Sequence, residues 1–222
     1  MILAGEVFVD GIRTSKSGTA VSNAALVEVN SRERKYASRG GFKLEGALRD
    51  FEIDPSGRAC LDVGSSTGGF TDCLLQHGAV RVYAVDVTVD QIAWKLRQDP
   101  RVVRLERNGR ELGASDIPEP VELVAVDVSF ISAAKVLPPA VAVAKSEADF
   151  LILVKPQFEL RREEIGPGGI VYDAALHEKA ISIVRQAAEL AGLVCLGVKA
   201  SQWAGAEGNQ EYFLHARKKS VE

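Results

Sequence analysis

The stretch that most constrains the fold is CLDVGSSTGGFTDCLL at residues 60–75, where an apolar run leads into a glycine-rich loop and then into a second apolar run. The first run has the length and composition of a strand, and the second has the spacing of a helix. A strand, a glycine loop and a helix in this order are typical of the ligand-binding edge of an α/β sheet. Glycines at that edge let the backbone approach a ligand closely.

Two phosphate-binding glycine motifs do not fit this loop. A P-loop needs a lysine after its last glycine, but Phe70 and Thr71 follow Gly69. A dinucleotide-binding loop needs a second glycine where Ser66 stands. The spacing that fits is D-x-G-x-x-x-G-G, which begins at Asp62. It predicts a ligand that resembles a nucleoside and lacks a pyrophosphate.

Strands and helices alternate from residue 44 onward. Strands are expected at 58–63, 80–86, 102–106, 121–127, 149–155, 193–200 and 211–217, and helices at 44–51, 69–77, 90–97, 132–144 and 174–191. Runs such as VELVAVDV are apolar throughout, as in a parallel sheet that helices cover on both faces. The pattern predicts one doubly wound, Rossmann-like α/β domain of about seven strands over residues 44–222.

Residues 1–43 do not follow this alternation of strands and helices. Two short strands are expected around an Asp10-Gly11 turn and a third in ALVEVN, so residues 1–30 form a small separate motif. Residues 31–43 hold five basic residues and one acidic residue. This basic linker is either a solvated connection or a strip that touches RNA phosphates. The RNA-binding candidates are Arg32, Arg34, Lys35 and Arg39.

Composition excludes several classes of site. The formal net charge is −3, so the chain as a whole is not a polycation that binds nucleic acid by charge alone. The three cysteines form no C-x-x-C pair, and the three histidines are scattered, so neither a disulfide framework nor a metal site is expected. No apolar run approaches the ~18 residues of a membrane span. We therefore expect a cytoplasmic protein without membrane contact.

Polar residues at the ends of the expected strands are the candidate ligand contacts. Asp86 follows Gly64 by 22 residues, a spacing at which a carboxylate can accept both ribose hydroxyls of a nucleoside. Alternatively, Asp86 is the N-cap of the next helix. Asn108 either faces an adenine or is a simple turn residue. The full candidate set is Asp62, Gly64, Ser65, Ser66, Gly68, Gly69, Asp86, Val87, Asn108 and Asp127.

Three charged residues mark the ends of later strands. Asp127 ends the fourth strand, Lys155 ends the fifth and Glu211 begins the last. A lysine at the end of a buried strand is unusual, because lysine is rarely buried without a partner. With the usual strand order, Asp127 and Lys155 lie side by side. They form either a structural ion pair or a catalytic pair.

These residues carry a resemblance to a known family. The segments SRGGFKLEGAL, CLDVGSSTGGFTDCLL, AVDV, QIAWKLRQDPRVV, DVSFIS, LVKPQFE and EGNQEYFL occur in one order over nearly the whole chain. In this respect the chain resembles the TlyA family, also labelled haemolysin A-like, within the FtsJ-like RNA 2′-O-methyltransferases. The resemblance implies S-adenosylmethionine in the glycine loop and methylation of a cytidine ribose in ribosomal RNA, with ribosomal RNA or ribosomal subunits as partners. It also implies a catalytic tetrad, which falls on Lys43, Asp127, Lys155 and Glu211.

The chemistry of the residues agrees with this expectation. Methyl transfer from a sulfonium is an in-line displacement, so positioning dominates. A ribose hydroxyl is a weak nucleophile, and Lys155 either accepts its proton or steers it by hydrogen bonding. Methyl transfer to an exocyclic amine usually accompanies an Asn/Asp-Pro-Pro-aromatic run, but the chain reads DVSF from Asp127. Methylation at carbon 5 of cytosine needs a cysteine, typically after proline, and no Pro-Cys occurs.

The N-terminal motif departs from the family pattern. ILAGEVFVDGIRTSKSGTAV resembles only the second half of an alpha-L-type RNA-binding domain, so residues 1–30 are expected to be a partial domain of that type. A second hypothesis follows, namely a non-catalytic RNA-binding or ribosome-assembly factor that retains a nucleoside pocket. A dehydrogenase of the same fold is disfavoured, because the G-x-G-x-x-G motif is missing.

Overall fold

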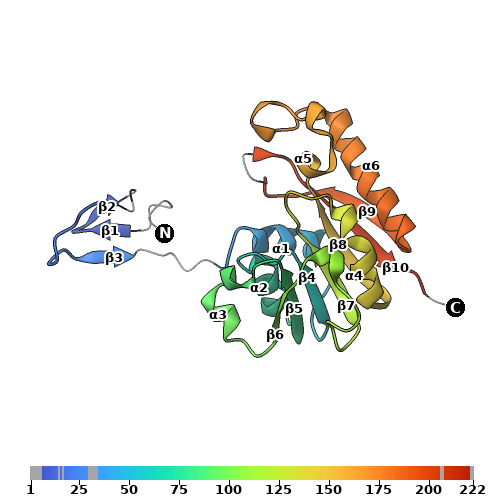
Figure 1. The fold of residues 1–222 in the computed structure, drawn as a ribbon, viewed down its shortest axis with the longest axis horizontal. Helices are drawn as coiled ribbons and strands as arrows, with labels where there is room; N and C mark the ends of the chain where they lie inside the picture. Colours follow the sequence, from blue (N-terminus) through green and yellow to red (C-terminus); the bar gives the residue numbers. More distant parts are fainter. Residues whose placement is uncertain (1–6, 15, 17, 30–34, 206–207, 221–222) are drawn as a thin grey trace. The chain divides into compact units, whose positions relative to one another are not determined.

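The computed structural model describes residues 7–14, 16, 18–29, 35–205 and 208–220. The chain forms two compact units, residues 1–35 and residues 36–222 (Figure 1). Within the described residues, no helix combines the length and the apolar character needed to cross a membrane.

The first unit holds a small antiparallel sheet with the strand order β2-β1-β3. Its strands are β1 (Val7–Val9), β2 (Ile12–Thr14) and β3 (Val27–Val29). Asp10 and Gly11 both have positive φ, 50° and 76°, as a tight two-residue hairpin turn requires. The hairpin and the third strand predicted from the sequence are therefore confirmed.

The second unit is built on a seven-stranded sheet with the order β6-β5-β4-β7-β8-β10-β9. Its strands are β4 (Ala59–Val63), β5 (Arg81–Asp86), β6 (Val102–Glu106), β7 (Val121–Val126), β8 (Ala144–Val154), β9 (Leu193–Ala200) and β10 (Tyr212–Lys218). Strands β4 to β8 pair in parallel, whereas β10 lies antiparallel between β8 and β9. The predicted α/β fold of about seven strands is confirmed.

Six α-helices are described in the second unit. They are α1 (Gly40–Asp50), α2 (Gly69–Gln76), α3 (Trp94–Arg97), α4 (Leu137–Val143), α5 (Pro156–Glu159) and α6 (Ala174–Leu190). Short 3-10 helices cover Val89–Gln91, Gly109–Glu111, Ala133–Lys135, Arg162–Glu164 and Pro167–Gly169. The segment 156–172, for which neither a strand nor a helix is expected from the sequence, contains α5 and two of these 3-10 helices.

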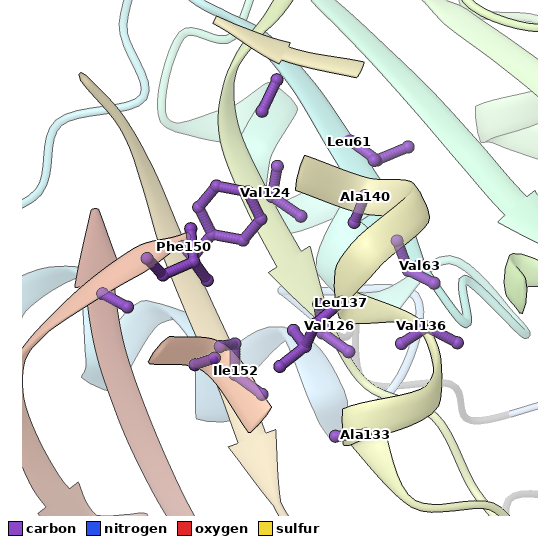
Figure 2. Close-up of a cluster of buried hydrophobic side chains, with 14 of the residues drawn as sticks. Leu61, Val63, Val124, Val126, Ala133, Val136, Leu137, Ala140, Phe150 and Ile152 are labelled. Atoms are coloured by element: carbon purple, nitrogen blue, oxygen red, sulfur yellow. The ribbon is translucent and has the colours of Figure 1, made fainter. Parts of the chain in front are cut away.

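Helices cover both faces of the sheet, and alternate strand residues point to opposite layers. Leu61 and Val63 of β4 join the cluster of buried side chains that includes α4 and α6, whereas Cys60 joins the cluster that includes α1 and α2. Figure 2 shows the first cluster, in which Phe150 and Ile152 of β8 lie among the same side chains. Two apolar layers explain why these strands are hydrophobic throughout.

Several boundaries differ from the expectation. The first helix begins at Gly40 rather than residue 44, which places Lys43 in its first turn. The expected helix 90–97 is a 3-10 turn followed by α3, and the expected helix 132–144 is a 3-10 turn followed by α4. Prolines in the first turn of α4 explain the second break, because a proline ring is tolerated only at a helix start. The strand expected at 149–155 already begins at Ala144.

Candidate functional site

The predicted charged residues meet at the carboxyl edge of the parallel strands. They surround a cavity of about 550 Å³, which we call the reaction cavity. Among the predicted residues, its lining includes Arg39, Lys43, Gly64, Ser65, Ser66, Gly69, Asp127, Lys155 and Glu211. All four members of the expected tetrad thus line one cavity, although they come from α1 and from the ends of β7, β8 and β10.

A second cavity of about 330 Å³ lies beside the first, and we call it the side cavity. Among the predicted residues, its lining includes Gly64, Ser66, Asp86, Val87, Asn108 and Asp127. The two cavities share Gly64, Ser66, Asp127, Ser129 and Phe130. The glycine loop (residues 64–69) and the segment after β7 therefore separate two adjoining spaces, one next to the lysines and one next to Asp86.

Two ion pairs face the reaction cavity. Lys43 Nζ lies 2.6 Å from Glu211 Oε2, and Lys155 Nζ lies 2.5 Å from Asp127 Oδ1. Lys155 also donates a hydrogen bond to Ser129 Oγ at 2.9 Å. The four charged side chains are between 2% and 21% exposed. Because water screens them little, these pairs fix the positions of the two ammonium groups more firmly than surface pairs would.

Glu211 is the most buried member of this set. Burial raises the pKa of its carboxyl, and the Lys43 ammonium opposes that rise. The carboxylate fits against Gly205, where a Cβ atom would overlap Glu211 Oε1. The backbone N–H of Ser201 also donates to the Glu211 carbonyl at 2.8 Å. The segment between Ser201 and Gly205 therefore packs directly against this residue.

The glycine loop depends on two residues with positive φ. Gly64 has φ +91°, and a Cβ atom there would overlap the carbonyl oxygen of Asp127. Gly68 has φ +90° and precedes α2, and a Cβ atom there would overlap Leu96. Only glycine combines this conformation with so close an approach. The loop is therefore held against the end of β7, where Asp127 stands.

Asp86 supports the same loop from the neighbouring strand. Its Oδ2 accepts a hydrogen bond from the Ser66 N–H at 2.8 Å, and its Oδ1 accepts one from the Thr88 N–H at 3.2 Å. The residue that precedes the following short helix is Thr88, so the N-cap alternative for Asp86 is wrong. A carboxylate has about four acceptor sites. Asp86 therefore retains acceptor capacity toward the side cavity.

The other two predicted contacts in the side cavity behave differently. Val87 is 63% exposed and offers an apolar surface. Asn108 Oδ1 accepts a hydrogen bond from the Arg110 N–H at 3.1 Å and caps a 3-10 turn. The turn interpretation of Asn108 is thus correct, and the residue also lines the cavity.

Two predicted ligand contacts line neither cavity. Gly68 packs against Leu96, and Asp62 is fully buried beneath the glycine loop. Asp62 Oδ2 accepts a hydrogen bond from Thr71 Oγ1 at 2.6 Å, while its Oδ1 has no hydrogen-bond partner among the described residues. Burial raises the pKa of this carboxyl to about 7. A direct ligand contact of Asp62 or Gly68 remains a prediction.

The basic candidates are placed only in part. Arg32 and Arg34 lie outside the described residues. Lys35 is exposed and belongs to the first unit. Arg39 is exposed and lines the reaction cavity, one residue before α1.

Two aromatic residues of the reaction cavity were not singled out from the sequence. Phe130 is 89% exposed and has φ +65°, which is rare for a bulky side chain. Its ring lies 5.3 Å from the ring of Phe158, and Lys155 Nζ lies 5.8 Å from the latter. The sequence signal that could have identified Phe130 is its position shortly after Asp127, the aspartate at the end of a predicted strand. Positive φ at a site-lining residue marks strain that the surrounding structure holds in place.

The segment 160–172 forms one wall of the reaction cavity. Asn209 is 3% exposed and uses both ends of its amide: Nδ2 donates to the Gly169 carbonyl at 2.9 Å, and Oδ1 accepts from the Val171 N–H at 3.0 Å. His177 contacts the Val171 carbonyl through Nε2 at 2.8 Å. The segment is therefore a fixed wall in this structure.

Within the described part of the chain, no group of three His, Cys, Asp or Glu residues could hold a metal ion.

Comparison with known sequences gives a consistent picture. A family model described as FtsJ-like methyltransferase matches residues 36–218. The chain is 50% identical over 219 residues to the 16S/23S rRNA (cytidine-2′-O)-methyltransferase TlyA of Mycobacterium tuberculosis, covering 98% of this chain and 82% of that protein.

Solved structures agree on the fold. A structure from Streptococcus thermophilus that carries the name hemolysin is 38% identical, with a TM-score of 0.84 over 99% of this chain and 81% of that one. The N-methyltransferase NodS of Bradyrhizobium japonicum, solved with S-adenosyl-L-homocysteine, has a TM-score of 0.55 at 12% identity over 81% of this chain and 88% of that one. At that identity, the second likeness concerns the fold alone.

Proposed function

Because the chain belongs to the FtsJ-like methyltransferase family, we propose that its two cavities bind S-adenosylmethionine and one ribonucleotide, and that the enzyme methylates the 2′-hydroxyl of that nucleotide. The observation that carries this proposal is the pair of shielded lysine–carboxylate contacts in the reaction cavity. The relative from M. tuberculosis is named for cytidine in ribosomal RNA. We propose the same substrate class here, with the reaction taking place in the cytoplasm.

The residues of the side cavity fit the nucleoside part of the cofactor. Asp86 has acceptor capacity for ribose hydroxyls, and Val87 and Asn108 line the space for the base. On the other side of the glycine loop, Ser65 is 3% exposed and its Oγ has no hydrogen-bond partner among the described residues. A buried hydroxyl without a partner costs about 1–3 kcal/mol, and a polar group of the cofactor would remove that cost. The chemistry supplied by this cofactor is a methyl group on a sulfonium sulfur.

The positions of Lys155 and Asp127 favour the steering role of the lysine. Lys155 Nζ donates a hydrogen bond to Ser129 Oγ and lies 2.5 Å from the Asp127 carboxylate, so it is held in this structure as a hydrogen-bond donor. As an ammonium, Lys155 Nζ donates a hydrogen bond to the ribose oxygen and directs a lone pair of that oxygen toward the methyl group. Asp127, whose side chain is 21% exposed, would accept the hydroxyl proton while the methyl group passes from the sulfonium sulfur, which becomes a neutral thioether, to the ribose oxygen.

The remaining residues of the reaction cavity hold the nucleotide. Lys43 and Glu211 form the opposite pair, in which the lysine places a positive charge next to the incoming ribose phosphate. Phe130 and Phe158 offer aromatic faces for its base. Arg39 lies in the lining, and we propose that it contacts RNA phosphates together with Arg32, Arg34 and Lys35. A purely non-catalytic RNA-binding role gains no support, because all four members of the expected tetrad are present and line the same cavity.

Transfer of a labelled methyl group to RNA tests this function. The purified protein is incubated with tritiated S-adenosylmethionine and ribosomal subunits from cells that lack the gene, and the product is digested to nucleosides. We expect label in a 2′-O-methylated nucleoside. Label only on a base, or no transfer to either subunit, would contradict the proposal.

Asp86 gives a prediction for cofactor binding. Replacing Asp86 with alanine removes an acceptor for the ribose and the contact with the Ser66 N–H. A hydrogen bond to a charged group contributes about 1.5–3 kcal/mol, so affinity for S-adenosylmethionine should fall by about 10- to 150-fold. Isothermal calorimetry measures this effect, with Asp90→Ala as the matched control because Asp90 is exposed and lines neither cavity. Equal affinity in the two variants would remove Asp86 from the cofactor site.

A further inference from the structure

The depth of the reactive groups restricts how RNA can enter. As whole residues, Lys155 is 8% exposed and Glu211 is 1% exposed, so both lie well inside the reaction cavity. A ribose within a continuous stacked helix cannot reach groups at this depth. The target nucleotide must therefore leave its stack, as in other enzymes that act on flipped nucleotides. The bases on either side of it then lose a stacking partner.

An exposed tryptophan stands next to this cavity. Trp203 is 46% exposed and lies between Ser201 and Gly205, the two residues that pack against Glu211. Its ring lies 5.1 Å from Phe42, which directly precedes Lys43 in α1. Phe42 in turn lies 5.1 Å from the buried Tyr36. Trp203 is thus the most exposed ring of an aromatic cluster with T-shaped and tilted contacts, and 46% of its surface is open to solvent.

An exposed tyrosine lies on the segment 160–172, which forms another wall of the same cavity. Tyr172 is 75% exposed and directly follows Val171, which Asn209 holds in place. Gly169, three residues before Tyr172, lines the reaction cavity. Arg161 and Arg162 are exposed on the same segment and are followed by Glu163, which is also exposed, and by Glu164, which pairs with Lys179. An aromatic ring and two arginines therefore occur together on this segment, without a net positive charge over residues 161–164.

We propose that Trp203 and Tyr172 form stacking surfaces for the unpaired RNA bases that flank the target nucleotide. This inference rests on the proposed function and narrows its substrate to an unpaired RNA segment. Aromatic side chains stack on any base, and nearby arginines attract the backbone, which is the usual composition of a single-strand binding surface. An RNA partner fits better than a protein, because the two rings stand on separate segments rather than in one apolar patch, and the segment of Tyr172 also carries exposed arginines.

Fluorescence provides a direct test, because the chain contains two tryptophans, Trp94 and Trp203. Each single-tryptophan variant, Trp94→Phe and Trp203→Phe, is titrated with an RNA hairpin that carries unpaired cytidines in its loop. We expect quenching in Trp94→Phe, where Trp203 remains, and little in Trp203→Phe. A fully paired RNA of equal length should quench Trp203 weakly. Quenching of Trp94 alone would overturn the proposal.

Kinetics supply the second measurement. Trp203→Ala and Tyr172→Ala should each raise KM for the hairpin by roughly 5- to 150-fold, the range that corresponds to loss of one base–aromatic stack. Trp203→Phe keeps a ring and should stay within about threefold, a difference that corresponds to about 0.65 kcal/mol. Leu190→Ala is the control, since Leu190 is 90% exposed at the end of α6, next to the start of β9. Affinity for S-adenosylmethionine should not change in any of these variants.

The outcomes separate this inference from the proposed function. Suppose that the wild-type enzyme is active, that the alanine variants keep its KM, and that RNA does not quench Trp203. This result would overturn the inference and leave the proposed methyl transfer intact. Hairpin binding with Trp203 quenching, but no methyl transfer to the hairpin or to either ribosomal subunit, would contradict the proposed function instead. If Trp203→Ala changes only self-association, measured by sedimentation, the surface is a protein contact and the inference fails.

Discussion

Replacing Lys155 with methionine is expected to lower kcat for RNA methylation by at least about 100-fold, the scale of the loss when a reacting group is no longer held in position. Methionine keeps the apolar stem beside Phe158 but removes the ammonium that faces Asp127 and Ser129. Affinity for S-adenosylmethionine should remain within about threefold, or ~0.65 kcal/mol, because in the proposed function the lysine contacts the hydroxyl rather than the cofactor. Single-turnover methyl transfer and calorimetry measure the two quantities.

Lys199→Met is the matched control for this experiment. Lys199 also lies over an aromatic ring, that of Phe51 at 5.3 Å, but it lines neither the reaction cavity nor the side cavity. It should leave kcat unchanged. If Lys155→Met retains activity within about threefold of the wild type, or ~0.65 kcal/mol of barrier, the lysine has no catalytic part, whether as base or as steering group.

Replacing Gly64 with alanine is expected to abolish measurable cofactor binding. The new Cβ atom would overlap the Asp127 carbonyl, and alanine would also have to adopt φ +91°. Because the obstacle is backbone rather than a flexible side chain, the glycine loop must move away from β7. That movement distorts both cavities, since Gly64 and Asp127 line each of them. Methyl transfer should be lost together with binding.

Gly57→Ala separates the effect of the steric overlap at Gly64 from the cost of placing alanine in a left-handed backbone conformation. Gly57 has φ +74°, but nothing lies within 4 Å of a Cβ atom placed there. Alanine at this position should cost about 1–2 kcal/mol of stability for the left-handed conformation and leave cofactor affinity unchanged. Thermal unfolding and calorimetry compare the two variants. Equal cofactor affinity in both would show that the loop tolerates a side chain at Gly64.

Much of the fold could be predicted from the sequence because its signals are local. The runs VELVAV and FLILV are buried along almost their whole length, as continuous apolar strands between two helix layers must be. The Asp10-Gly11 pair gave the correct hairpin turn because few residues adopt positive φ. The family motifs likewise placed four charged residues that line one cavity.

Errors arose where tertiary contacts override local propensity. The expected helix 90–97 breaks at Ile92 and Ala93, whose ψ angles are 132° and 139°, and Ile92 is buried in the cluster beneath α2. The early start of β8 depends on pairing between Ala144 and Val121, next to an irregularity in the register. Neither feature has a repeating pattern that a short window of sequence could reveal.

The sequence by itself determined the types of chemistry available: a glycine loop after a buried strand, acids at strand ends, and two lysines in family motifs. Only the tertiary structure decided which charges meet. Lys43 and Glu211 are 168 residues apart, and they pair because β10 inserts antiparallel beside β8 and so begins at the edge where α1 starts. The tertiary structure also buried Asp62 beneath the loop and exposed Phe130, Tyr172 and Trp203. The periodicity of the sequence indicates which face of a strand is apolar, whereas pairing between distant segments depends on how the whole sheet assembles.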